Sequence, residues 1–191
     1  MSAPSTTRSF GGLTIPTAGT FVIDPAHTEV GFVARHLMVS KVRGSFTQVT
    51  GEVTIAEDPL ASSVSASILA ASIDTGVADR DNHLRSGDFL DVEKYPELTF
   101  RSTRLVQPKD NEFHLVGELT IRDVTREVTL DVEFDGVAVS PWGQEVVAFT
   151  ATTEIDREDW GITWNQALEA GGVLVSKKVK IEISAEATRQ V

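Results

Sequence analysis

The residues best suited to chemistry are gathered between positions 79 and 91, in the segment DRDNHLRSGDFLD. His83 follows Asp81 by two positions, and a histidine placed beside a carboxylate can act as a general acid or base. One hypothesis is therefore an enzyme, a hydrolase or an isomerase, that acts on an apolar substrate through His83 and Asp81. The other is a solvated connection in which Asp81 and Arg85, four positions apart, form a weak surface ion pair.

Other reactive sites find little support in the residue types. The chain has no Cys, which excludes a disulfide, a thiol nucleophile and Cys-ligated zinc. Serine occurs without a G-x-S-x-G motif, and no G-x-G-x-x-G loop is present to hold a phosphate. The four His residues are dispersed, so a metal site would require His27, His36 and His83 to converge in space. We expect no metal and no cofactor, and we favour a binding protein over an enzyme.

Composition also limits the partners and the location. The formal net charge is −11, which disfavours a nucleic acid partner. No long continuous apolar run occurs, so we expect no membrane-spanning segment. Residues 1–19 are rich in Ser, Thr, Gly and Pro and lack the apolar stretch of a secretory signal. We therefore expect a flexible N-terminal segment and a cytoplasmic protein.

Residues 20–191 are expected to form one all-β domain, because apolar and polar residues alternate with a period of two along most of this length. The alternation is cleanest over residues 127–139, whose inward-facing positions would be Val128, Leu130, Val132 and Phe134. About eight such strands with short reversals predict an antiparallel barrel or sandwich. Residues near 77–91 interrupt this pattern and predict a short helical insert.

An eight-stranded barrel leaves no strand edge exposed and can enclose one small ligand. Small residues on the expected inner face leave room for such a ligand; they are Gly44, Gly51, Ala66 and Ala151. A fully packed interior is the other outcome, since apolar faces usually form a core. In that case the barrel would serve only as an interaction module.

Several blocks of the sequence, in the same order, resemble the YceI-like family. They include DPAHTEVGFVARH at residues 24–36, RDNHLRSGDFLD at 80–91 and REDWGI at 157–162. The resemblance covers about residues 20–187. It implies an eight-stranded antiparallel, lipocalin-like β-barrel with the helical insert near residues 77–91. It also implies a polyisoprenoid lipid, of the prenyl quinone or polyprenyl phosphate type, held in the apolar interior by a carrier, storage or sequestration protein.

The resemblance and the strand parity together predict the residues that contact the lipid. The lining candidates are Phe32, Phe46, Ile55, Phe89, Leu98, Phe100, Ile121, Phe149, Trp160 and Trp164. The candidates for the head group and the lid are His27, His36, Arg80, His83 and Arg85. If the head is a diphosphate, Arg80, Arg85 or Arg157 would have to neutralise it. The sequence leaves a homodimer open.

Overall fold

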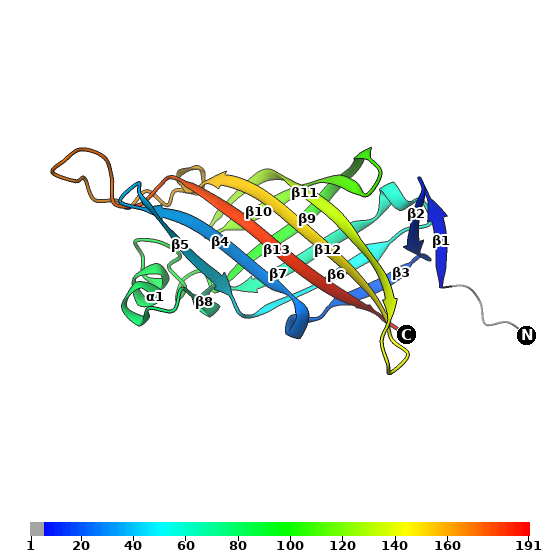
Figure 1. Cartoon of the computed structure of the whole chain (residues 1–191). Helices are drawn as coiled ribbons and strands as arrows, with labels where there is room; N and C mark the ends of the chain where they lie inside the picture. Colours follow the sequence, from blue (N-terminus) through cyan, green and yellow to red (C-terminus); the bar gives the residue numbers. More distant parts are fainter. Residues whose placement is uncertain (1–5) are drawn as a thin grey trace, which may run out of the picture.

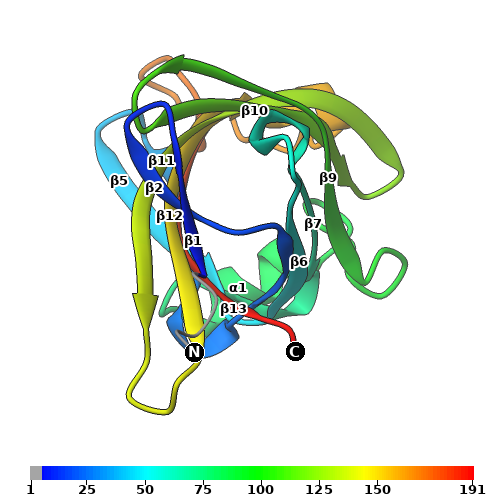
Figure 2. The same cartoon turned by 90° about the vertical axis from the view of Figure 1, so that its right-hand side faces the viewer.

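The computed structural model describes residues 6–191, and its main feature is a closed antiparallel barrel (Figures 1 and 2). Eight strands form the ring, in the spatial order β13-β3-β6-β7-β9-β10-β11-β12 and back to β13. Their bounds are β3 Gly19–Ile23, β6 Val49–Ile55, β7 Ser63–Leu69, β9 Glu97–Lys109, β10 Glu112–Ile121, β11 Val124–Val139, β12 Glu145–Asp156 and β13 Lys178–Arg189. The prediction of an eight-stranded antiparallel barrel is confirmed.

The ring closes at β13, which pairs with β12 along one edge and with β3 along the other. β12 pairs with β13 from Val146 opposite Thr188 to Asp156 opposite Lys178. The other edge of β13 pairs with β3 and then with β4, which spans Glu29–His36. Two further strands, β5 (Ser40–Phe46) and β8 (Ile73–Asp74), continue the wall beside β4. Closure satisfies the backbone groups that open edges would expose.

Inward side chains form apolar clusters toward the two ends of the barrel. One cluster includes Phe89, Leu98, Ile121 and Val128. A second includes Phe21, Val53, Phe134 and Val147, and a smaller third one is made by Ile23, Val30 and Val49. Val128 and Phe134 come from the stretch with the cleanest alternation, and both are buried as that pattern predicts. The inner face is therefore decided by strand parity, as expected for a sheet with one side in water.

A hairpin of two short strands, β1 (Thr7–Phe10) and β2 (Leu13–Pro16), lies at one end of the barrel (Figure 1). Its turn is made by Gly11 and Gly12, both with positive φ. Ile15 is buried in the adjacent cluster, and the guanidinium of Arg8 donates to the carbonyls of Ala56 and Glu57. The composition predicted a flexible segment over residues 1–19. It gave no indication that part of this segment forms a hairpin that covers the apolar end of the barrel. Residues 1–5 of that segment lie outside the described residues.

The opposite end of the barrel carries the helical insert (Figure 1). Helix α1 spans Ala78–Arg85, within the predicted range. Asp81 accepts hydrogen bonds from the backbone N and Oγ1 of Thr75, at 2.9 and 2.6 Å. Arg85 donates to the carbonyls of Ala71 and Ile73. The expected Asp81–Arg85 pair is therefore replaced by separate contacts that fix the helix to the wall. No helix within residues 6–191 is long and apolar enough to cross a bilayer.

Candidate ligand-binding cavity

The barrel encloses an apolar cavity of about 370 Å³. At one end it is bounded by Phe10, Ile15 and Pro16 of the N-terminal hairpin segment. At the other end it is bounded by the helical insert and the residues that follow it, through Leu84, Phe89 and Leu90. Cavities of several hundred Å³ with mostly apolar linings are typical of sites for small hydrophobic ligands.

An open depression of about 560 Å³ also lies on the outer face of β6, β7, β9 and β10. Its floor is made of short polar and small residues, including Thr50, Ser65, Ser67 and Thr99. Three of these, Thr50, Ser65 and Thr99, are solvent-exposed. Because such a surface offers little apolar area to bury, we assign the functional site to the enclosed cavity.

Eight of the ten predicted lining residues do line the cavity: Phe32, Phe46, Ile55, Phe89, Leu98, Phe100, Ile121 and Phe149. The exceptions are Trp160 and Trp164. Trp160 is buried in the core cluster beside the cavity, where its Nε1 donates to the carbonyl of Leu119 at 3.0 Å. Trp164 packs its ring against His83 and Phe89, at centroid distances of 4.6 and 5.4 Å. Trp160 ends a 3-10 helix and Trp164 lies in the loop that follows, and strand parity gives no guide to direction outside strands.

The five predicted head-group and lid residues lie outside the cavity lining. Arg80 and Arg85 bond to oxygens of the segment before the helix, Arg80 through Thr75 and Arg85 through two carbonyls. His27 and His36 are solvent-exposed. These contacts agree with a role in holding the insert for the two arginines, and the head-group role of all five remains a prediction.

His83 and Asp81 do not form the catalytic pair that the enzyme hypothesis requires. His83 Nε2 lies 2.9 Å from Asp88 Oδ2, whereas the Asp81 carboxylate is bonded to Thr75. Neither His83 nor Asp81 lines the cavity. The structure therefore gives no support to these two residues as an acid–base pair for a substrate held in the cavity.

Arg157 is the one charged residue among the described residues that line the cavity, and the lining predictions missed it. It belongs to the 3-10 helix η4 (Arg157–Trp160), directly after β12, and it lines the cavity although it is only 5% exposed. A signal for it exists in the sequence. Ile155 faces the cavity from the end of β12, and Arg157 comes two positions later, which continues the same inward parity.

The guanidinium of Arg157 is only partly satisfied. Its Nε donates to the carbonyl of Ser176 at 3.0 Å, and Nη1 donates to the carbonyl of Ile162 at 2.8 Å. Within residues 6–191, Nη2 is the one buried side-chain nitrogen or oxygen that has no hydrogen-bond partner. Burial lowers the pKa of Arg157, while the carboxylates of Glu158 and Asp156 act in the opposite direction. The guanidinium also stands 5.9 Å from the centre of the Phe89 ring.

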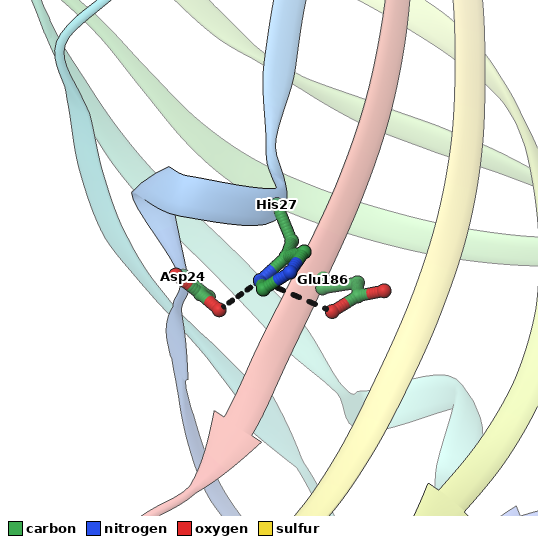
Figure 3. A group of neighbouring side chains, drawn as sticks. All are labelled: Asp24, His27 and Glu186. Carbon is green, nitrogen blue, oxygen red and sulfur yellow. Dashed lines mark hydrogen bonds and ion pairs between the residues drawn. The ribbon is translucent and has the colours of Figure 1, made fainter. Parts of the chain in front are cut away.

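A separate cluster of titratable groups lies on the outer wall, where β3 gives way to β4 (Figure 3). His27 Nδ1 is 2.7 Å from Asp24 Oδ2 and 3.8 Å from Glu186 Oε2. Among the described residues, these three side chains form a group whose ligand atoms lie close enough for a metal ion. The hydrogen bond to Asp24 raises the pKa of His27, and the same bond lowers the pKa of Asp24. The raised pKa favours the protonated ring of His27, so we describe the group as an ion pair between His27 and the Asp24 carboxylate.

The His27 cluster predicts a pH dependence of stability. The folded-state pKa of His27 is raised above its ordinary value of 6.5, so its stabilising contribution is complete below pH 6.5 and is lost as pH rises through the folded pKa. The lowered pKa of Asp24 has the opposite effect, since its contribution is lost as pH falls through the folded pKa. His27→Gln should therefore flatten the fall in Tm above pH 6.5. Thermal melts across pH 5–9, with NMR titration of the His27 ring, check this; an unchanged slope in His27→Gln would contradict it.

The closed barrel with its apolar interior places the chain in the class of lipocalin-like β-barrels. A family model described as a YceI-like domain matches residues 21–187. A UPF0312 protein of Staphylococcus epidermidis is 45% identical over 171 residues, which cover 87% of this chain and 95% of that protein. The chain belongs to the YceI-like family.

Two solved structures show the same fold. BcnA of Burkholderia cenocepacia has a TM-score of 0.76 and 22% identity, with 87% of this chain and 99% of that chain covered. A structure from Saccharophagus degradans, described as a polyisoprenoid binding domain implicated in plant cell wall breakdown, has a TM-score of 0.69 and 12% identity. That match covers 89% of this chain and 98% of the other. At these identities the likeness establishes the fold alone.

Proposed function

We propose that this protein binds a polyisoprenoid lipid, of the prenyl quinone or polyprenyl phosphate type, and acts as its carrier, store or sequestering protein. The observation that carries this proposal is the apolar cavity, which is bounded by residues of the N-terminal hairpin segment at one end and of the helical insert at the other. A long, flexible apolar chain fits such a space. The description of the Saccharophagus degradans structure as a polyisoprenoid binding domain supports the same ligand class.

The energetics favour a tail of several isoprenoid units. Burial of one CH₂ group contributes about 0.8 kcal/mol, so a five-carbon unit contributes roughly 4 kcal/mol before any cost. Association costs about 4–15 kcal/mol in lost freedom. A micromolar Kd, about −8 kcal/mol, then requires roughly three to six buried units. Short prenyl compounds should therefore bind weakly.

A binding role is favoured over catalysis by the same residues. The family and its structural neighbours indicate a binding protein rather than an enzyme. The polar side chains of the insert are engaged in contacts with the insert itself and with the adjoining segment, as in Arg80 with Thr75 and His83 with Asp88. An apolar cavity with one charged side chain among its described lining residues is suited to holding a lipid and offers no acid–base pair.

The test of the proposal is to identify what the purified protein carries. We expect native mass spectrometry to show a protein–lipid complex, and organic extraction followed by lipid analysis to yield a prenyl lipid. Stripped protein should recover binding when a prenyl lipid with four or more units is added. Protein that is free of prenyl lipid, and that fails to bind one after stripping, would overturn the proposal.

Two predictions from the sequence accompany this proposal. The prediction of a homodimer is tested by the molar mass from light scattering during size-exclusion chromatography, with and without ligand. The cytoplasmic location is to be measured by fractionation of the source cells with antibody detection.

A further inference from the structure

The turn between β4 and β5 presents three consecutive apolar side chains to solvent. Leu37, Met38 and Val39, here called the β4–β5 tip, are 42, 52 and 80% exposed. The turn lies at the end of the barrel that carries α1 (Figure 1). Neighbouring apolar side chains that remain in water mark surfaces that contact a membrane or another protein.

The backbone of the tip makes Leu and Met unfavourable choices for the turn itself. Leu37 and Met38 have φ values of 54° and 58°, and the N–H of Val39 donates to the carbonyl of His36 at 3.1 Å. Positive φ at both central residues is the pattern of a type I′ turn, which favours Asn and Gly and strains other side chains. Neither the turn nor solubility explains these two residues, which indicates a function for their apolar surface.

The tip is fixed to the barrel wall, close to the cavity. The N–H of Leu37 donates to the carbonyl of Leu174 at 2.9 Å, and His36 forms a β-bridge with Val175. Val175 lines the cavity, and so does Ala34 on β4. The cavity lining therefore begins directly behind the tip.

The strands behind the tip carry positive charge on a protein that is acidic overall. The net charge is −11, yet residues 30–51 contain no Asp or Glu. Arg35 and Lys41 are exposed and stand opposite each other on β4 and β5. The adjoining loop, residues 163–176, adds one carboxylate, that of Glu169. Like charges placed opposite each other destabilise a strand pair, whereas an anionic lipid surface attracts both of them.

We propose that the β4–β5 tip docks the protein on an anionic lipid bilayer. Leu37, Met38 and Val39 enter the interfacial layer, and Arg35 and Lys41 contact the acidic head groups. An apolar surface with adjacent basic residues is the combination that binds such interfaces. Three apolar side chains are too few for a stable protein–protein interface, which uses about 20–30 residues on each side. The inference goes beyond the proposed function, because docking requires no particular ligand in the cavity.

The test is flotation of the full-length protein with vesicles of phosphatidylcholine alone, or of an equal mixture with phosphatidylglycerol. We expect binding to the mixed vesicles that weakens at high salt, and much weaker binding to phosphatidylcholine. Leu37→Asn/Met38→Gly should lower the affinity for mixed vesicles at least about 10-fold. Its Tm should equal or exceed that of the wild type, because Asn and Gly suit the turn, so lost binding is separated from lost folding.

Two further variants test the charge and the location. Arg35→Gln/Lys41→Gln should weaken binding to mixed vesicles roughly 30-fold, since each basic residue near an anionic surface contributes about fivefold. Trp142→Ser is the matched control. It removes a side chain that is 85% exposed in the turn between β11 and β12, at the opposite end of the barrel, and it should bind as the wild type does (Figure 1).

A second readout reports insertion directly. The chain has no Cys, so Val39→Cys accepts an environment-sensitive dye at one position only. The emission of this dye should shift to the blue when mixed vesicles are added. Val139→Cys, at the end of β11 and 64% exposed in the wild type, carries the same dye as a control and should show no shift.

The outcomes keep docking apart from lipid binding in the cavity. If the wild type ignores mixed vesicles, docking fails, while extraction of a prenyl lipid still decides the proposed function. If Leu37→Asn/Met38→Gly binds like the wild type, or if Trp142→Ser loses binding, the tip is not the contact. Equal binding to both kinds of vesicle would overturn the role of Arg35 and Lys41. If the tip variant instead turns a dimer into a monomer and vesicles are not bound, the tip is a contact between copies and the proposal is overturned.

Discussion

Phe32→Asp is expected to abolish lipid binding by the folded protein. Phe32 projects from β4 into the cavity, and its ring lies 5.8 Å from the ring of Phe46. It also covers Gly44 on the neighbouring strand, where an added Cβ would overlap the ring. The substitution removes apolar contact and places a carboxylate in an apolar space, so we expect at least a ~100-fold loss of affinity, about 3 kcal/mol.

The matched control for Phe32→Asp is Val33→Asp, one position along the same strand. Val33 faces the other side of the wall, opposite Arg43 on β5 and Lys180 on β13. A carboxylate there meets two cations and leaves the cavity unchanged, so lipid binding should equal that of the wild type. Calorimetry and extraction of copurified lipid are the measurements. Full lipid occupancy in a folded Phe32→Asp protein would show that the cavity is not the binding site.

Arg189→Ala is expected to cause a large loss of stability. Arg189 donates to both carboxylate oxygens of Glu145, at 2.8 and 3.3 Å, and its guanidinium stands 4.7 Å from the centre of the Phe21 ring. It also donates to the carbonyls of Thr17 and Ala18, which join the N-terminal hairpin to the barrel. The Glu145 side chain is 5% exposed. Removal of its partner leaves a buried charge, which costs about 3–5 kcal/mol and lowers Tm by roughly 10 °C.

Two controls distinguish this buried pair from an ordinary surface one. Arg101 pairs with Glu118 at 3.3 Å, but its side chain is 75% exposed, so Arg101→Ala should change the free energy of unfolding by less than about 0.5 kcal/mol. The double variant Glu145→Leu/Arg189→Met should be more stable than Arg189→Ala, because no buried charge remains. Urea unfolding measures all three. A loss in Arg189→Ala no larger than that in Arg101→Ala would contradict the buried-pair argument.

The helical insert shows which structural features could be predicted from the local sequence and which could not. Its position and helical character were predicted, as was Phe89 in the cavity lining, which also includes Leu84 and Leu90. The partners of its polar residues differ from the predicted Asp81–Arg85 pair. Asp81 bonds to Thr75 and His83 bonds to Asp88, because the fold of the segment decides which side chains come within hydrogen-bond reach.

What the sequence alone determined is the wall of the barrel and most of the cavity lining. Alternation with a period of two assigns each strand residue to one of two faces, and seven of the eight predicted residues that line the cavity lie on strands, where this local property applies. Only the tertiary structure decided the ends of the cavity and the packing beside it. The N-terminal hairpin and the packing of Trp160 depend on contacts between segments far apart in the chain. No local periodicity encodes such contacts, so they appear only when the barrel closes and brings those segments together.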